Sequence, residues 1–188
     1  MLHSTILKII LLGLFAGTVS SFAEAPLPRE VFGSIGWGLN YDDEGSIGSG
    51  ITGGGGFGYR LWQRLGVEGE FNAFSSRREF GSIVPPFHMT GVRVMGNGLL
   101  YLNRGRAQSF VLAGAGITHV RNKFDLAGVR ATNSSTGLSV AAGFGVRIFL
   151  TPRWSLRPEL RVEAARTNGA IEAPFASIRF STALGYHW

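Results

Sequence analysis

The chain has 188 residues, a length suited to one domain, and it contains no cysteine. The absence of cysteine excludes a disulfide framework, a thiol nucleophile and a lipidated N-terminus. The formal net charge of +6 comes mostly from arginine, but the arginines are spread singly along the chain, which argues against a nucleic-acid-binding protein.

The first residues have the features of a secretory signal peptide. Lys8 precedes an apolar run over residues 9–19, and Ala23 offers a small residue for cleavage. The run is shorter than the roughly 20 apolar residues that a membrane-spanning helix needs. We therefore predict a cleaved signal peptide over residues 1–23 and one mature domain over residues 24–188.

Apolar and polar residues alternate in eight segments of the mature chain. A period of two indicates strands with one apolar and one polar face. The predicted strands cover residues 30–39, 50–61, 65–74, 87–102, 109–120, 137–150, 154–166 and 174–188. Several of them are about twice as long as the five or six residues that are usual in soluble proteins. Which side of the strand faces the barrel interior is ambiguous only in residues 109–120, where we expect Gly114, Gly116 and Thr118 to point inward.

Long polar breaks alternate with short turns between these strands. The long breaks are residues 40–46, 75–86, 121–136 and 167–173, and the short turns are residues 62–64, 103–106 and 151–153. Bacterial outer-membrane barrels have even strand numbers, short periplasmic turns and longer outer loops. The pattern predicts an all-β, eight-stranded, antiparallel up-and-down transmembrane β-barrel in the outer membrane, monomeric and with both termini in the periplasm.

Aromatic residues near the strand ends favour a membrane barrel over a soluble one. A soluble barrel such as a lipocalin would turn its apolar face inward around a ligand, and it would need neither such long strands nor tryptophans at their ends. Interfacial girdles of aromatic side chains are typical of barrels that cross a membrane. The predicted girdle residues are Trp37, Trp62, Trp154, Tyr186 and Trp188.

Three stretches carry a resemblance to a known family: residues 143–147, residues 150–161 and the terminal residues 184–188. On these stretches the mature chain resembles the small outer-membrane barrels typified by the OmpA transmembrane domain, OmpX and the Opa-like proteins. The resemblance implies that the outer-membrane assembly machinery reads the aromatic C-terminal strand. Pro158 departs from the pattern, since proline cannot donate to a strand ladder, and predicts a local bulge.

The polar faces of the strands predict a charged lumen. An eight-stranded barrel is only wide enough for side chains to fill it, so charges inside it must pair. We expect a closed plug of salt bridges, with a gated polar path as the alternative. Six arginines and four glutamates make up this predicted lumen set: Arg60, Glu68, Glu70, Arg93, Arg147, Arg157, Glu159, Arg161, Glu163 and Arg179.

Basic residues in the long breaks suggest contacts with lipopolysaccharide phosphates, which guanidinium groups bind well. Solvated loop charge is the alternative interpretation. The candidate residues are Arg77, Arg78, Arg121, Lys123 and Arg130. Residues 42–44 (Asp-Asp-Glu) give only a weak indication of a divalent cation, because adjacent carboxylates alone do not form a defined loop.

Two motifs partly match enzymatic or nucleotide-binding signatures. Residues 53–58 match GxGxxG, but that fingerprint needs a following helix, and a strand is predicted there instead. His119-Val120-Arg121-Asn122 partly resembles the His-x-Ser-Asn element of the outer-membrane lipid A deacylases, with arginine in place of the serine nucleophile. Ser134 and Ser135 lie in a predicted loop without an orienting carboxylate.

We therefore predict no catalytic, cofactor-binding or metal-binding residues and no nucleic-acid partner. The leading function is a non-enzymatic surface barrel with a structural or adhesive role, whose partners are outer-membrane lipids and lipopolysaccharide. A small-solute channel and a lipid A-modifying enzyme remain as the alternatives.

Overall fold

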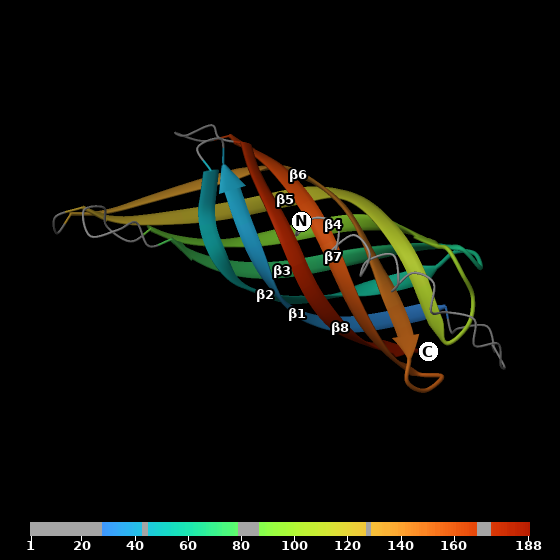
Figure 1. Ribbon diagram of the computed structural model, residues 1–188. Coiled ribbons are helices and arrows are strands. Elements are labelled where there is room, and N and C mark those ends of the chain that lie inside the picture. The colour runs from blue at the N-terminus through green and yellow to red at the C-terminus, as the bar shows by residue number, and fades with distance from the viewer. Residues whose placement is uncertain (1–27, 43–44, 79–86, 127–128, 169–173) are drawn as a thin grey trace, which may run out of the picture.

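The computed structural model describes residues 28–42, 45–78, 87–126, 129–168 and 174–188. The predicted signal peptide lies outside these residues. The described chain forms eight strands, and none of it forms a helix long and apolar enough to cross a membrane (Figure 1). The strands are β1 (Arg29–Asp42), β2 (Gly45–Arg60), β3 (Leu65–Arg78), β4 (Phe87–Tyr101), β5 (Ala107–Leu126), β6 (Val129–Phe149), β7 (Trp154–Asn168) and β8 (Pro174–His187).

Each strand pairs antiparallel with the next, and β8 returns to pair with β1, so the sheet closes into a barrel. At the seam Glu30 lies opposite His187, and the Arg29 amide donates to the Trp188 carbonyl oxygen at 3.3 Å. Closure leaves no unpaired strand edge along the wall. The predicted eight-stranded antiparallel barrel is confirmed.

The two ends of the barrel differ. One end, called here the turn end, holds the connections 61–64, 102–106 and 150–153 and the seam between Arg29 and Trp188. The opposite end, called the hairpin end, is where β5 and β6 extend well past the neighbouring strands (Figure 1).

Side chains alternate strictly between the lumen and the outer surface. Ile35 is 68% exposed and Leu138 is 74% exposed, whereas Phe110 and Thr118 on the opposite face of the wall are buried. The ambiguous strand β5 follows the prediction, because Cβ atoms added at Gly114 and Gly116 would meet the lumen side chains of Asn97 and Met95.

The long polar breaks were predicted wrongly. Residues 121–126 and 129–136 belong to β5 and β6, which stay paired as far as Leu126 opposite Val129. The neighbouring strands also run further than predicted, with β1 reaching Asp42 and β3 reaching Arg78. A polar hairpin can satisfy its backbone groups by cross-strand pairing outside the membrane, so polarity alone did not mark the strand ends.

The predicted bulge at Pro158 is also wrong. The β6–β7 pairing keeps one register on both sides of Pro158, with Gly145 opposite Glu159 and Ile148 opposite Leu156. The register instead shifts in the β1–β2 pair beside Asn40 and Tyr41.

Candidate functional site

The lumen contains most of the charged side chains predicted to face inward. Nine of the ten are buried, with Arg60 as the exception. Arg60 lies half-buried at the turn end, where its guanidinium carbon is 4.0 Å from the Tyr101 ring centre. Its guanidinium also donates to Gln108 Oε1 at 2.6 Å. The nine buried residues are Glu68, Glu70, Arg93, Arg147, Arg157, Glu159, Arg161, Glu163 and Arg179.

The centre of the lumen is a network of shared ion pairs. Glu68 accepts hydrogen bonds from Arg157 at 2.6 Å and from Arg161 at 3.1 Å. Arg161 also lies 2.6 Å from Glu70 Oε2 and 2.8 Å from Glu159 Oε1. The Arg161 side chain, with no exposed surface, is thus surrounded by three carboxylates, the arrangement that a buried charge requires.

The network continues towards the hairpin end. The Arg179 NH2 atom lies 3.0 Å from Glu70 and 3.6 Å from both Glu159 and Glu163. Arg93 pairs with Glu163. These contacts join β8 and β4 to the carboxylates of β3 and β7 across the lumen.

Glu30 completes the network at the turn end, and the sequence analysis missed it. Its carboxylate accepts a hydrogen bond from Arg147 at 2.5 Å and lies 3.7 Å from His187 Nε2. Glu30 occupies an even-numbered position of β1, like the buried residues Phe32 and Asn40. This period of two is the sequence signal that could have identified Glu30 as facing the lumen. Among the described residues, five buried glutamates now match five buried arginines. The predicted arginine excess of six to four is therefore wrong.

Aromatic rings support the guanidinium groups inside the barrel. The Arg157 guanidinium lies 4.3 Å from the ring centre of Phe32 and 5.8 Å from that of Phe110. A Cβ atom at Gly56 would lie 2.6 Å from the Phe32 ring, and one at Gly145 would lie 2.7 Å from the Phe110 ring. The two glycines therefore leave the space in which the rings sit beneath Arg157.

Two small cavities lie beside the network in the described part of the lumen. One cavity of about 20 Å³ lies near the hairpin end between Asn40, Thr52 and Arg93. A second of about 10 Å³ lies near the turn end between Glu30, Tyr101 and other residues. A cavity needs on the order of 10–15 Å³ to hold one water molecule, so each has room for about one or two.

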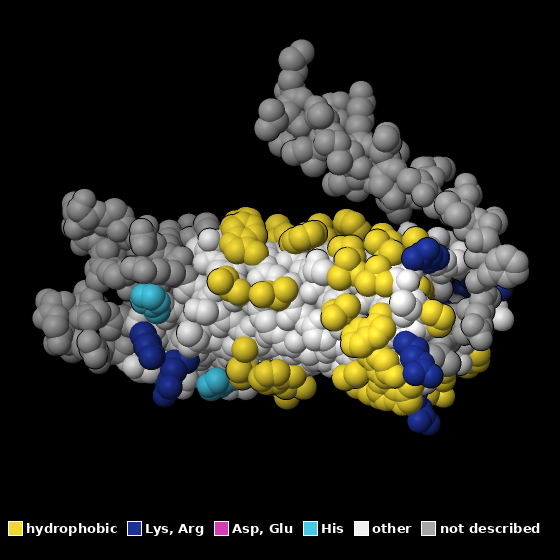
Figure 2. Space-filling model, turned by 90° about the horizontal axis from the view of Figure 1, so that it is seen from below, with side chains coloured by type: hydrophobic (Ala, Val, Ile, Leu, Met, Phe, Trp, Pro, Cys, Tyr) yellow, Lys and Arg dark blue, Asp and Glu magenta, His cyan; other side chains and the backbone are white. Residues whose placement is uncertain are grey.

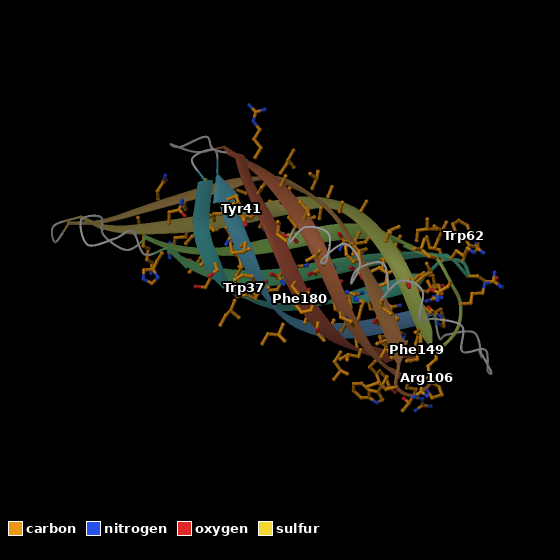
Figure 3. The ribbon with its side chains drawn as sticks, in the orientation of Figure 1. Trp37, Tyr41, Trp62, Arg106, Phe149 and Phe180 are labelled. Atoms are coloured by element: carbon orange, nitrogen blue, oxygen red, sulfur yellow. The ribbon has the colours of Figure 1, made fainter. Side chains whose placement is uncertain are left out.

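The outer surface carries an apolar band with aromatic residues at the turn end (Figure 2). Trp62 is 67% exposed and lies in a turn at that end (Figure 3). Tyr186 contacts both Trp154 and Trp188, with ring centres 5.1 and 6.1 Å away. Trp37 lies further along the wall, 48% exposed and opposite Phe180.

The apolar band ends along a line of polar residues near the hairpin end. The exposed residue Thr90 lies opposite Ser75 on β3 and opposite Arg121 on β5. Arg121 in turn lies opposite Ser134 on β6, and exposed Arg166 lies opposite Leu138. An apolar wall bounded by such a line is the surface expected of a membrane-spanning barrel.

An exposed cluster, called here the basic rim, lies on and beside this line: His88, His119, Arg121 and Lys123. His88 lies opposite Lys123 across the β4–β5 pair, and His119 shares a 2.8 Å hydrogen bond with Thr136. The basic rim contains two of the five predicted lipopolysaccharide contacts, Arg121 and Lys123. The side chains of the other three, Arg77, Arg78 and Arg130, lie outside the described part of the chain.

The motifs that partly match enzymatic or nucleotide-binding signatures lie on strands. Residues 53–58 are part of β2, followed by a turn and β3 rather than by a helix. His119 is exposed and bonded to Thr136, and Ser134 and Ser135 belong to β6, not to a loop. The described residues contain no group of side chains suited to a metal ion, and residues 43–44 fall outside them.

Comparison with solved structures identifies the same architecture in known proteins. Neisserial surface protein A (NspA) is 17% identical, with a TM-score of 0.61 over 85% of this chain and 97% of that one. Ail, the attachment invasion locus protein of Yersinia pestis, is 18% identical, with a TM-score of 0.60 over 85% and 99%. The structure of Ail in complex with the heparin analogue sucrose octasulfate matches at 17% identity, with a TM-score of 0.57 over 85% and 99%.

No curated protein sequence matches the chain. The profile of the outer membrane protein beta-barrel domain, however, matches residues 9–183. With its closed barrel, apolar outer band and filled lumen, the chain belongs to the outer membrane protein beta-barrel domain family of the bacterial outer membrane.

Proposed function

We propose that the protein is a non-enzymatic surface barrel that is closed to solutes and acts through its hairpin end. The observation that carries this proposal is the charge-matched network that fills the lumen. Its five arginines and five glutamates are at most 5% exposed, and the two cavities that the described residues form beside them measure about 10 and 20 Å³. A static channel would need a continuous path, whereas an eight-stranded barrel is only wide enough for side chains to fill it.

The hairpin end faces the cell exterior in this proposal, and both termini lie in the periplasm. The compact connections of the turn end match the short periplasmic turns of bacterial barrels. The projecting β5–β6 hairpin suits the exterior, where a long polar element can reach beyond the lipopolysaccharide. Protease treatment of intact cells should cleave an epitope placed at residues 127–128 and spare one placed in the turn 102–106.

The basic rim is the proposed contact surface. Arg121 and Lys123 are exposed at the border of the apolar band nearest the hairpin end, where lipopolysaccharide phosphates would meet the wall in this orientation. Guanidinium and ammonium groups bind phosphate and sulfate oxygens through charge-assisted hydrogen bonds. The likeness to Ail, whose structure holds a sulfated heparin analogue, supports a polyanionic glycan or lipopolysaccharide as the partner class.

Two measurements test the proposal. In planar bilayers the folded protein should be nearly silent, and a large steady conductance would favour the small-solute channel instead. Binding of purified lipopolysaccharide should weaken at least about tenfold in the Arg121→Ala/Lys123→Ala variant and fall with added salt. The matched control is Arg29→Ala/Arg153→Ala, which removes two exposed arginines at the turn end.

The alternative of a lipid A-modifying enzyme predicts a different result. Mass spectrometry of lipid A from cells that express the protein should show no new species under our proposal. Loss of an acyl chain that depends on His119 would overturn the non-enzymatic role, because His119 is the residue that the deacylase resemblance singles out.

A further inference from the structure

The outer wall carries an apolar groove at the turn end. The groove has a volume of about 380 Å³ and runs over the outward faces of β3, β4 and β5. Its walls are Leu65, Val67, Leu100 and Val111, each between 39% and 43% exposed, and its floor includes Gly98. In the register Gly98 lies between Val67 and Ala113.

The missing side chain at Gly98 creates the depth of this groove. A Cβ atom there would meet only the Ala113 carbonyl oxygen at 3.9 Å, an ordinary van der Waals distance. The barrel wall therefore has room for a side chain at position 98. Since glycine weakens a strand, its presence at a site that accepts a larger residue points to a use for the open space.

Exposed arginines stand where the groove meets the turns. Arg64 immediately precedes the groove residue Leu65, and its carbonyl oxygen accepts the Tyr101 amide at 2.8 Å, which fixes it beside the end of β4. Arg104 is exposed in the β4–β5 connection, shortly after Leu100. Figure 3 shows Trp62 and Arg106 at this same end.

We propose that this groove binds one acyl chain of an anionic phospholipid, whose phosphate is held by Arg64 and Arg104. The apolar walls match the hydrocarbon chain, and the two guanidinium groups at its polar end match the phosphate and the net negative headgroup. Trp62, 67% exposed in the turn next to Arg64, supplies the amphipathic ring that favours the headgroup level. Charge complementarity selects an anionic phospholipid over a zwitterionic one.

The site lies at the opposite end from the basic rim, and its test is independent of the proposed surface role. The folded protein, purified from outer membranes in a neutral detergent, is titrated with phosphatidylglycerol or phosphatidylcholine of equal chain length. Native mass spectrometry counts the bound lipids. We expect one tightly bound phosphatidylglycerol, preferred about tenfold over phosphatidylcholine, the order expected for two arginines beside an anionic headgroup.

Two variants separate the parts of the site. Gly98→Leu fills the groove and should abolish tight binding of both lipids, whereas Arg64→Ala/Arg104→Ala should remove the preference for phosphatidylglycerol. Gly96→Leu is the matched control, because Gly96 is also outward on β4, a Cβ there would meet only a carbonyl oxygen at 4.0 Å, and it lies outside the groove. A heat-dependent gel shift verifies that each variant is folded.

The proposal is overturned by equal binding of the two lipids, or by a Gly98→Leu variant that binds phosphatidylglycerol like the parent. It is also overturned if the groove is an interface between two copies, in which case the parent spectrum would show dimers that Gly98→Leu abolishes. Loss of binding in the Arg121→Ala/Lys123→Ala variant would move the site to the basic rim and equally refute it.

Discussion

Glu30 and Arg147 stand 117 positions apart in the sequence and form a 2.5 Å ion pair inside the barrel. The side chains of both are at most 5% exposed. Arg147 also donates to the Tyr101 hydroxyl oxygen at 2.6 Å. The pair joins the first strand to the sixth and brings the buried charges of the described lumen into balance.

Removal of this carboxylate should destabilise the barrel. Glu30→Gln leaves the Arg147 guanidinium buried without its counter-charge, for which we expect a loss of about 3–5 kcal/mol in the free energy of unfolding. Urea titration of the protein in lipid vesicles, followed by tryptophan fluorescence, measures it. The double variant Glu30→Gln/Arg147→Met should regain part of the loss, since it leaves no unpaired charge. An unchanged urea midpoint for Glu30→Gln would contradict the role of the pair.

A substitution at Glu159 tests whether the ion-pair network also closes the lumen to ions. It lies 2.8 Å from Arg161, 3.4 Å from Arg157 and 3.6 Å from Arg179. Glu159→Ala should lower the unfolding temperature and add anion-selective conductance in planar bilayers, because the remaining positive charge admits water and anions. Leu160→Ala, on the other face of the same strand, should leave conductance at the parent level. A silent Glu159→Ala barrel would show that other side chains close the lumen.

The space beside Phe32 gives a steric prediction. Gly56→Ala places a Cβ atom against the Gly69 carbonyl oxygen as well as 2.6 Å from the Phe32 ring, and it should cost about 1–3 kcal/mol through overpacking. Gly69→Ala is the matched control, since a Cβ atom at Gly69 meets nothing within 4 Å. Unfolding temperatures of the two variants, measured side by side, test the difference. Equal temperatures would mean that the Phe32 ring and the β3 backbone at Gly69 both move without cost.

The C-terminal residue should matter for assembly. The Trp188 amide donates to the Arg29 carbonyl oxygen at 3.1 Å, and its ring lies 5.9 Å from Phe57 on β2. Deletion of Trp188 should reduce the membrane-inserted fraction while secretion into the periplasm continues. Cell fractionation combined with the heat-dependent gel shift measures both quantities. Equal insertion of the truncated chain would contradict this role.

Much of the fold could be predicted from the sequence because a barrel wall repeats one simple rule. The alternation of Arg157, Glu159 and Arg161 with Leu156 and Leu160 fixes which side of β7 faces the lumen. The same period of two predicted nine buried charges. Local polarity did not predict the β5–β6 extension, because a polar segment can be either a loop or a paired hairpin.

The lumen was predicted less well where its side chains are not charged. Phe32, Tyr101 and Phe110 face inward, and the sequence analysis did not place them in the lumen. Their placement depends on gaps that glycines leave on neighbouring strands, as at Gly56 and Gly145. Such cross-strand complementarity requires the register, which a single sequence does not contain.

The ion pairs of Glu30, Glu68 and Glu70 cross the barrel, and this has a consequence for how the protein is made. Strands β1 and β3 supply Glu30, Glu68 and Glu70, whereas their guanidinium partners come from β6, β7 and β8. Strands β1–β4, if inserted alone, would bury carboxylates in the membrane without their guanidinium partners and without water to solvate them. Insertion of one hairpin at a time would therefore leave buried charges unpaired until the last strand is inserted. The two halves of the chain are stable in the membrane only when both are present.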